Sequence, residues 1–255
     1  MWQDIRLLNA TANALLGLLA LAILGSALWW VVHRPLFTLR EVRLEGPEQA
    51  MLRQVSPSTV RGTALPRIKG NFFTANLEEV RVAFESVPWV RRAAVRREWP
   101  NKLVVVIDEH QPLGTWGEDG RLISVQGDLF TANLAEAEED GDLAEFNGPV
   151  GSEREMVARF RDFGAWLAPI DLAPEAVQLS NRYAWSMRLN NGITVELGRE
   201  QNRDTLKARV ERLVQIYPQL VARLQDRIES VDMRYPNGLA LQAAGLEIAP
   251  EPKKN

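Results

Sequence analysis

The feature that most constrains this chain is a run of 26 residues, Leu7 to Val32, in which no side chain is charged. As a helix rising about 1.5 Å per residue it extends about 39 Å, which exceeds the roughly 30 Å hydrocarbon core of a bilayer. Its strongly apolar part begins near Ala14 and ends at Trp29-Trp30-Val31-Val32, and paired tryptophans favour the headgroup boundary. The sequence therefore predicts one membrane-spanning helix over residues 7–33, after a short tail of residues 1–6.

A cleaved signal peptide is the alternative, because Gly25-Ser26-Ala27 has the small residues that a signal peptidase reads. A signal peptide usually combines a basic front with an apolar run of only about 7 to 15 residues. Here the run is longer and Asp4 nearly cancels Arg6. These differences favour a permanent tether.

Flanking charges indicate the direction of insertion only weakly. Arg34, Arg40 and Arg43 follow the helix and Arg6 precedes it. By the positive-inside rule, these charges would place most of the chain in the cytoplasm. A six-residue tail cannot hold a domain, however, and long folded regions often cross regardless of charge. We expect the bulk of the chain on the far side.

Small and polar residues share one face of this helix at Asn9, Asn13, Gly17 and Ala20. Such a face favours contact with another membrane helix. The simpler interpretation, which we prefer, is that the asparagines lie at the membrane interface.

Composition and motifs argue against catalysis. The 255 residues contain no cysteine and two histidines, His33 and His110, with a net charge of -3. Asp108-Glu109-His110 ends a predicted strand, and neighbouring strand residues point to opposite faces, so we expect a structural role. No nucleophile elbow, phosphate-binding loop or zinc spacing is present. We expect a binding protein with no cofactor, metal, nucleic acid or small-molecule substrate.

After the membrane segment the pattern predicts a small α+β domain. Residues 39–46 alternate as a strand, and residues 48–70 indicate a short helix and a loop. Asn76 with Glu79 predicts a capped helix that ends before Pro88. Val90–Trp99 and Leu103–Ile107 predict a hairpin.

A basic cluster lies in that hairpin, at Arg91, Arg92, Arg96, Arg97 and Lys102. Nucleic-acid binding is one interpretation. A domain across a membrane meets no cytoplasmic nucleic acid, so a solvated face, lipid phosphate or a protein partner is favoured.

The second half predicts a further domain. Residues 114–130 form short pieces separated by glycines, and six acidic residues between Glu136 and Glu145 favour a solvated loop over a metal site. Ser152 with Glu155 predicts another capping box and helix.

The strongest hairpin signal of the chain follows in this half. Apolar and polar residues alternate over 185–189 and 193–197, across Asn190-Asn191-Gly192. A helix from Leu206 to Tyr217, interrupted at Pro218, and strands at Ile228–Tyr235 and Leu239–Gln242 complete the pattern.

Ordered motifs along nearly the whole chain resemble the bacterial FtsQ/DivIB cell-division family. In the first half they are Gly70-Asn71-Phe72-Phe73, Leu77-Glu78-Glu79-Val80-Arg81, Pro88-Trp89-Val90, Val95-Arg96-Arg97 and Trp99-Pro100-Asn101-Lys102-Leu103. In the second half they are Glu109-His110-Gln111-Pro112, Gly148-Pro149, Leu189-Asn190-Asn191-Gly192, Leu197-Gly198-Arg199, Tyr217-Pro218 and Val231-Asp232-Met233-Arg234-Tyr235.

The resemblance implies an α+β protein of the bacterial inner membrane, single-pass, with a cytoplasmic N-terminus and its bulk in the periplasm at the division septum. It implies a POTRA domain (36–108), a C-terminal β domain of mainly antiparallel sheet with flanking helices (109–244) and a flexible tail (245–255). The implied role is a non-enzymatic divisome scaffold that binds FtsB and FtsL and helps control septal peptidoglycan synthesis. FtsW, FtsI, FtsK, FtsN and FtsA are further implied partners.

The family's main partner surface is carried over to the last strands, where a strand of FtsB would add to the sheet edge. The implied residues are Arg234, Tyr235, Asn237, Gly238, Leu239 and Leu241. Pro236 suits a sheet edge because proline cannot donate to a ladder, although other family members carry a different residue there. A simple Pro-Asn-Gly turn is the alternative. In the POTRA domain, Arg91, Arg92, Arg96 and Arg97 are weaker candidates.

Two other classes of function are kept open. A POTRA-bearing chaperone or translocation component would bind extended client chains. A membrane-anchored envelope hydrolase would need a catalytic constellation that the sequence does not reveal.

Overall fold

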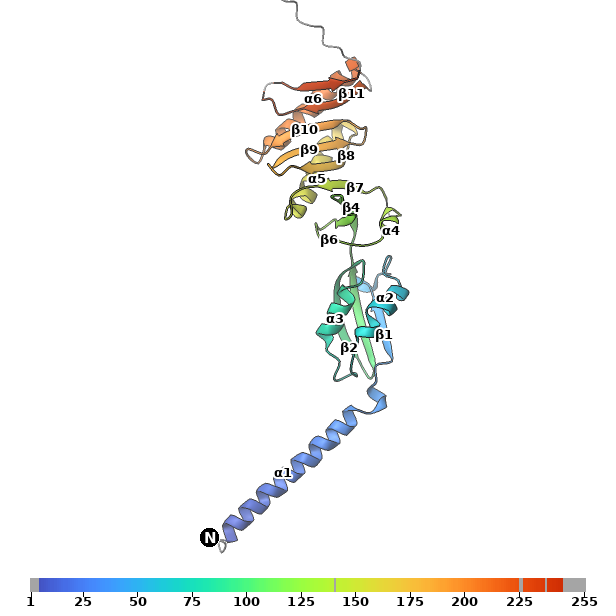
Figure 1. The fold of residues 1–255 in the computed structure, drawn as a ribbon, viewed down its shortest axis with the longest axis vertical. Coiled ribbons are helices and arrows are strands. Elements are labelled where there is room, and N and C mark those ends of the chain that lie inside the picture. The colour runs from blue at the N-terminus through green and yellow to red at the C-terminus, as the bar shows by residue number, and fades with distance from the viewer. Residues whose placement is uncertain (1–4, 140, 225–226, 237, 245–255) are drawn as a thin grey trace, which may run out of the picture. The chain divides into compact units, whose positions relative to one another are not determined.

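The computed structural model describes residues 5–139, 141–224, 227–236 and 238–244. The predicted tail at 245–255, most of the tail at 1–6, Asp140 and Asn237 therefore lie outside the described residues. Two compact units divide the chain, one up to Glu109 and one from His110 onward (Figure 1).

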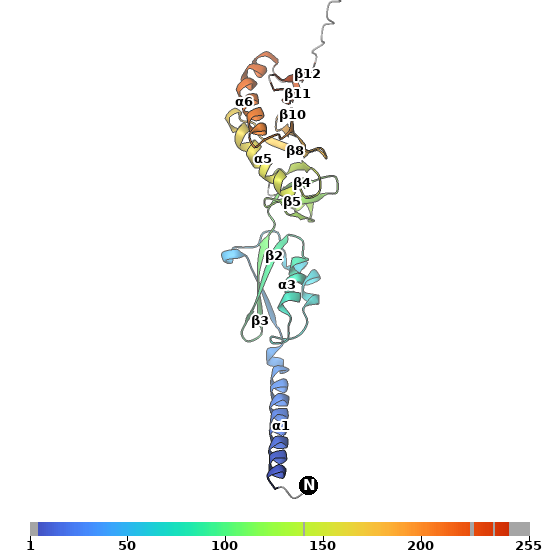
Figure 2. The ribbon, with the colours of Figure 1, turned by 90° about the vertical axis from the view of Figure 1, so that its left-hand side faces the viewer.

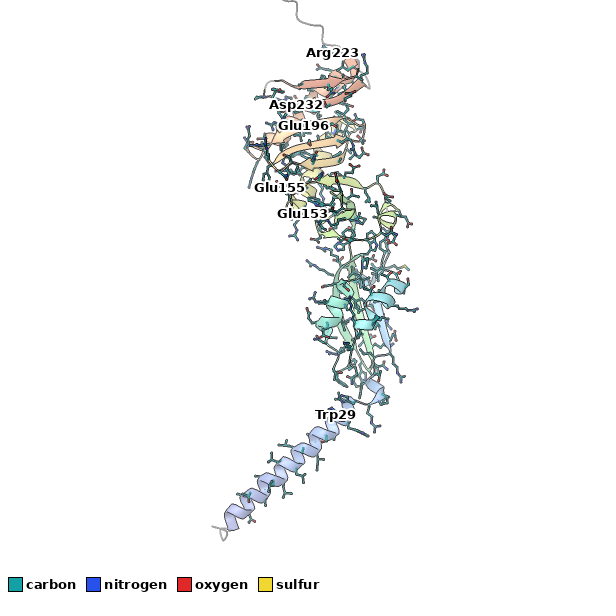
Figure 3. All side chains as sticks on the ribbon, in the orientation of Figure 1. Trp29, Glu153, Glu155, Glu196, Arg223 and Asp232 are labelled. Carbon is teal, nitrogen blue, oxygen red and sulfur yellow. The ribbon has the colours of Figure 1, made fainter. Side chains whose placement is uncertain are left out.

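Helix α1 runs from Ile5 to Val32, which confirms the predicted helix. Its stretch from Asn9 to Val32 is long and apolar enough to cross a membrane, and it buries nothing within the chain. Trp29 lies near its C-terminal end (Figure 3). Asn9, Asn13 and Gly17 are all exposed on it.

The first unit contains a three-stranded sheet in the order β1-β3-β2. The strands are β1 (Glu41–Glu45), β2 (Val90–Glu98) and β3 (Lys102–Glu109), with β1 parallel and β2 antiparallel to β3. The helices are α2 (Pro57–Thr63) and α3 (Leu77–Glu85), with short 3-10 turns at Pro35–Phe37, Pro47–Gln49 and Leu65–Arg67. The predicted strand, helices and hairpin are confirmed.

Local sequence explains these elements. Central strand β3 buries Leu103, Val105 and Ile107 completely, and these alternate residues share one face, as expected for a strand with helices on one side. The side chain of Asn76 caps α3 by accepting the backbone N–H groups of Glu78 and Glu79. Its amide also donates to the Glu79 carboxylate at 3.0 Å, so the predicted cap forms.

Glu109 has the structural role that we expected. Its carboxylate accepts the backbone N–H groups of Arg53, Gln54 and Val55 at 2.9, 3.0 and 2.7 Å. A charged acceptor satisfies these donors more strongly than a neutral one. The end of β3 is thereby joined to the loop before α2.

Among the described residues of the second unit, nine strands form one sheet in the order β12-β11-β10-β9-β8-β7-β4-β5-β6. The bounds are β4 (Pro112–Trp116), β5 (Arg121–Ser124), β6 (Leu129–Phe130), β7 (Ala144–Asn147), β8 (Pro174–Leu179), β9 (Ala184–Leu189), β10 (Thr194–Arg199), β11 (Ile228–Asp232) and β12 (Ala240–Ala243). Most neighbouring strands are antiparallel, while β4–β7, β7–β8 and β10–β11 are parallel. This confirms the mainly antiparallel sheet of the predicted α+β class.

Helices α5 (Glu153–Leu167) and α6 (Thr205–Leu224) lie on one side of that sheet (Figure 2). A short α4 (Leu134–Glu138) and a 3-10 turn at Ala168–Ile170 complete the unit. Phe163 of α5 contacts Trp185 of β9 with ring centroids 5.9 Å apart, and both are buried. The strands and helices share one core.

The hairpin between β9 and β10 is confirmed at the predicted place. The Gly192 N–H donates to the Leu189 carbonyl at 2.8 Å, and Gly192 has a φ of 83°. Glycine adopts this conformation without a steric cost. The Asn191 side chain also donates to the Tyr217 hydroxyl of α6 at 2.9 Å.

The predicted interruption of the last helix at Pro218 is wrong, because α6 continues to Leu224. Proline removes one helical hydrogen bond. Beyond it, Leu220 and Leu224 still pack against the core, and this burial holds the helix together. The strand predicted at Ile228–Tyr235 ends earlier, at Asp232.

Two further expectations need correction. Ser152 precedes α5 but its side chain does not cap the helix, because its backbone (φ -93°, ψ 1°) lacks the extended conformation of a capping residue. Its hydroxyl donates to the Pro149 carbonyl at 2.6 Å. Glu153 and Glu155 occupy the first turn of α5 (Figure 3). The acidic stretch is not one loop, because Glu136 lies in α4 and Glu145 in β7. Ala137 is buried, so packing orders part of this stretch.

Phe163 is fully buried in this common core, so truncating its side chain should strongly destabilise the second unit. Phe163→Ala should lower the free energy of unfolding of the second unit by about 3–5 kcal/mol. Val150→Ala, at a residue that is 92% exposed, should change it by less than about 0.5 kcal/mol. Urea unfolding of the purified full chain measures both. Equal effects of the two variants would contradict this packing.

Candidate functional site

Strand β12 is one end of the nine-stranded sheet and pairs with β11 through partners such as Leu241 and Val231. The backbone N–H of Ala244 donates to the Arg227 carbonyl of the neighbouring chain segment at 2.8 Å. Backbone groups of successive residues alternate in direction along a strand. Leu241 and Ala243 therefore direct their backbone groups toward the free edge.

Side chains of β12 do not share this direction. Leu239 and Leu241 are half-buried and pack against the core, while Ala240 and Gln242 are exposed. The side chains of these two predicted site residues thus hold the strand against the core. What β12 offers a partner is its backbone, as an edge strand does.

Arg212 of α6 holds the turn that leads into β12. Its guanidinium donates to the Met233 carbonyl at 3.0 Å, to the Tyr235 carbonyl at 2.9 Å and to the Pro236 carbonyl. Three carbonyls without strand partners are satisfied by one fork-shaped side chain. Sequence reasoning missed Arg212; its only signal is a position three residues after Arg209, on the same helical face.

Asp232 and Arg234 form the second contact of this turn. Asp232 accepts the Arg234 backbone N–H at 2.9 Å and its guanidinium at 2.6 Å. These hydrogen bonds hold the pKa of the Asp232 carboxyl below its usual value and raise the pKa of Arg234. Arg234, a predicted site residue, is therefore already paired within the chain.

Strand β10 supports the turn from the other side. The Met233 N–H donates to the Glu196 carbonyl at 2.9 Å, and Glu196 is the register partner of Asp232 (Figure 3). A Cβ added at Gly198, where φ is 73°, would lie 2.9 Å from Cγ of Arg234. Glycine at this position lets Arg234 lie across β10.

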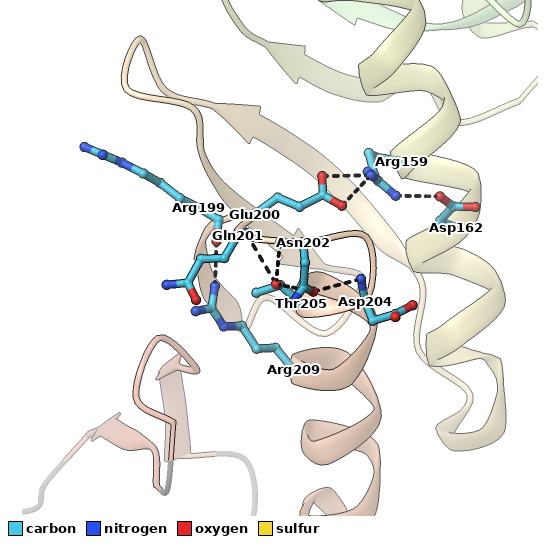
Figure 4. A network of polar contacts seen from close by, with 9 residues as sticks. All are labelled: Arg159, Asp162, Arg199, Glu200, Gln201, Asn202, Asp204, Thr205 and Arg209. Atoms are coloured by element: carbon cyan, nitrogen blue, oxygen red, sulfur yellow. Dashed lines mark hydrogen bonds and ion pairs between the residues drawn. The ribbon is translucent and has the colours of Figure 1, made fainter.

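Figure 4 shows the polar network that connects β10 to α6. Arg159 of α5 donates to both carboxylate oxygens of Glu200 at 2.7 and 2.8 Å. Arg209 donates to the Arg199 carbonyl at 3.0 Å, and burial lowers the pKa of its guanidinium. The helix that carries Arg212 is thereby fixed to the sheet.

Tyr235 and Gly238, two further predicted residues of the edge, lie at the surface. Tyr235 is 55% exposed, and an added Cβ at Gly238 meets no atom within 4 Å. Asn237 lies outside the described residues. The exposed tyrosine and the free strand edge lie next to each other in the sequence.

The structure separates the four predicted arginines of the POTRA domain. Arg91 pairs with Asp108 at 3.1 Å and Arg96 with Glu45 at 3.5 Å. Arg97 donates to the Ala75 carbonyl at 2.7 Å. Arg92 is exposed and, of these four, is the one whose side chain makes no ion pair or hydrogen bond to a described residue.

No group of three His, Asp or Glu side chains that could hold a metal ion occurs within the described ranges. The chemistry of the edge is backbone hydrogen bonding beside one exposed phenol. Such an edge offers backbone donors and acceptors to an incoming chain.

Arg212→Ala should leave the carbonyls of the turn without their donor, at a cost of about 1–3 kcal/mol. Hydrogen exchange of the amides in 233–244 should accelerate markedly, while Arg203→Ala, at an exposed arginine, should leave it unchanged. Mass spectrometry of the full chain resolves this segment. Unchanged protection in Arg212→Ala would contradict the assigned clamp.

The Asp232–Arg234 pair predicts a pH dependence. Because the folded-state pKa of Asp232 is depressed, its stabilisation is complete above the unfolded pKa near 4 and is lost as pH falls through the folded pKa. The difference in Tm between the parent chain and Asp232→Asn should therefore be constant above about pH 5 and shrink toward about pH 2. A difference that persists unchanged into acid would disprove it.

Comparison with known proteins gives the family. The description "POTRA domain, FtsQ-type" matches residues 37–110, and "Cell division protein FtsQ/DivIB, C-terminal" matches residues 114–234. The second match ends at the turn before β12.

Individual relatives extend over nearly the full chain. Cell division protein FtsQ of Burkholderia pseudomallei is 50% identical over 254 residues, covering 100% of this chain and 99% of the relative. The proteins of the same name from Bordetella pertussis (96% and 94% covered) and Nitrosospira multiformis (94% and 98% covered) are each 41% identical. With a free sheet edge behind a POTRA-type unit and an apolar helix, the chain belongs to the FtsQ/DivIB family of cell division proteins.

Proposed function

We propose that this chain is a non-catalytic scaffold of the divisome that binds FtsB and FtsL by strand addition at the free edge of β12. Helix α1 anchors it in the inner membrane, with the N-terminus cytoplasmic and both domains, 36–108 and 109–244, in the periplasm at the septum. Through FtsB and FtsL it helps control septal peptidoglycan synthesis. The observation that carries the proposal is that no strand of the described residues pairs with the outer edge of β12 in a protein of this family.

An edge strand offers an incoming chain a ladder of backbone donors and acceptors. Here the strand is anchored by Leu239 and Leu241, and its entry turn is held by Arg212. The edge is therefore ordered before a partner arrives, which reduces the conformational entropy lost on binding.

Side chains around the turn supply selectivity. Tyr235 is a large exposed aromatic, of the type that often carries binding energy at interfaces. Gly238 keeps the approach to β12 free of side chains. Asn237 and Arg234 complete the proposed surface. Arg234 would contribute the part of its guanidinium that does not pair with Asp232.

Other partners would use other parts of the chain. Arg92 is the most available of the POTRA arginines, since Arg91, Arg96 and Arg97 are engaged internally. The exposed face of Asn9, Asn13 and Gly17 suits a second membrane helix. FtsW, FtsI, FtsK, FtsN and FtsA are the candidate division proteins for these surfaces.

The chaperone alternative would predict binding of many unrelated extended chains. The relatives with high identity carry the name of a cell division protein, which favours one dedicated partner set. Midcell localisation of a fluorescent fusion in dividing cells discriminates the two.

The sharpest test removes one outward backbone N–H. Ala243→Pro removes the donor that faces the free edge, and proline is tolerated at that position of an edge strand. Ala243→Ser keeps the donor and is the matched control. Affinity of the full-length chain for an FtsB–FtsL complex should fall about tenfold or more in Ala243→Pro and change little in Ala243→Ser.

Two side-chain variants complete the experiment. Tyr235→Ala and Gly238→Glu should both weaken the same binding while thermal unfolding stays unchanged, because both sites are exposed. Undiminished co-purification of FtsB and FtsL with Ala243→Pro and with these two variants would refute strand addition at β12.

A further inference from the structure

Four aromatic side chains form a cluster at one end of the POTRA sheet. Phe37 contacts Phe73 and Trp99 with ring centroids 4.9 and 5.6 Å apart. Phe72 contacts Phe73 and Trp99 at 5.2 and 5.6 Å. Phe37, the Phe72–Phe73 loop and the turn after β2 thus meet at one place.

Only half of this cluster is covered by the domain. Phe72 is 8% exposed and completes the core, whereas Trp99 is 65% and Phe73 45% exposed. Leu36, next to Phe37, is 69% exposed. Contiguous exposed apolar side chains mark a surface that contacts a membrane or a protein partner.

The cluster lies close to the end of the membrane helix. Phe37 follows Val32, the last residue of α1, by five residues, which span at most about 17 Å. The Asn71 side chain donates to the Val32 carbonyl at 2.8 Å, and the Phe72 N–H donates to the Phe37 carbonyl at 2.8 Å. The aromatic rings cannot lie far from the bilayer surface.

The rings are also held in fixed positions. Asn71 Oδ1 accepts the backbone N–H groups of Phe73 and Thr74 at 3.0 Å each, and Arg97 binds the Ala75 carbonyl. Gly70 takes a φ of 93° to begin this turn. Phe73 is therefore presented by a rigid loop.

The charges next to the cluster in the sequence are mostly positive. Within three residues of the four aromatic positions the carboxylate is Glu98, while the cations are Arg34, Arg40, Lys69, Arg96, Arg97 and Lys102. Lys102 and Arg96 pair with Glu41 and Glu45, and Arg97 donates to the Ala75 carbonyl. Arg34, Arg40 and Lys69 pair with no carboxylate of the described residues. Lipid phosphates attract such cations, and tryptophan favours the boundary between headgroups and acyl chains.

We propose that Phe73, Trp99 and Leu36 insert into the outer boundary of the same bilayer that α1 crosses, so that the POTRA domain rests on the lipid surface. The occupant is lipid, because the patch is continuous with the membrane helix and its charge complements phosphate. This second attachment fixes the orientation of the POTRA sheet relative to the membrane. It rests on α1 spanning the bilayer and is independent of FtsB binding.

The absence of cysteine in the chain allows single labels to test this. The full chain carrying Phe73→Cys with an environment-sensitive fluorophore is placed in nanodiscs of phosphatidylethanolamine and phosphatidylglycerol, and quenching by a headgroup-linked quencher is measured. Met51→Cys, 92% exposed and after the far end of β1, is the matched control, and Leu28→Cys marks the membrane helix.

Quenching at Phe73→Cys should be several-fold greater than at Met51→Cys and should approach that at Leu28→Cys. Adding Trp99→Ser should reduce it several-fold, because the second anchor is lost. Quenching at Phe73→Cys no greater than at Met51→Cys, or unaffected by Trp99→Ser, would overturn the proposal. A blue-shifted emission of the Phe73→Cys label that appears only in nanodiscs holding two chains would assign the patch to a second copy and would equally overturn the proposal.

Discussion

Packing of α5 and α6 against one face of the nine-stranded sheet is the interaction on which the second unit depends. Phe163, Leu167, Val210 and Leu213 of the helices and Trp185 of the sheet belong to one buried cluster. Burial of this size stabilises the strands far beyond what pairing alone provides. Among the described residues, β12 and β6 are the two edge strands of this sheet. Leu239 and Leu241 pack against the same core as the helices, so the edge at β12 is attached to that core.

Polar contacts then decide the shape of this end. Strand β11 stops at Asp232, and the carbonyls that follow it are satisfied by Arg212 from α6 instead of a neighbouring strand. Asp232 holds Arg234 in the same turn. Each contact satisfies a group that would otherwise lack a partner at the edge. The result is an ordered strand whose outer backbone has no strand partner in the part of the chain that the structure describes.

In the first unit, charged side chains of the strands hold the loops to the sheet. Glu109 accepts a backbone N–H of the loop before α2, and Arg97 donates to the Ala75 carbonyl of the loop before α3. With Arg91 and Arg96 also paired, the basic hairpin is mostly a structural element and only Arg92 remains available. An ordinary solvated face is polar. The aromatic cluster beside α1 differs from it more than the basic hairpin does, because Trp99 and Phe73 are large, apolar and exposed.

The amino-acid sequence was sufficient to predict the elements that depend on a few adjacent residues. The uncharged run of α1, the Asn76 cap and the Asn190-Asn191-Gly192 hairpin each depend on a few adjacent residues, and each was predicted. Family motifs then placed the last strands as a partner surface, a prediction that still awaits its test.

Features that depend on distant contacts or on the backbone path became visible only in the folded structure. Helix α6 continues past Pro218 because Leu220 and Leu224 reach the core. Ser152 does not cap α5 because its backbone is not extended there. Arg212 contacts residues more than twenty positions away, so no local pattern reveals it. Exposure of Trp99 and burial of Leu241 likewise follow from which surfaces the fold brings together, since hydrophobicity alone does not say which apolar side chain is covered.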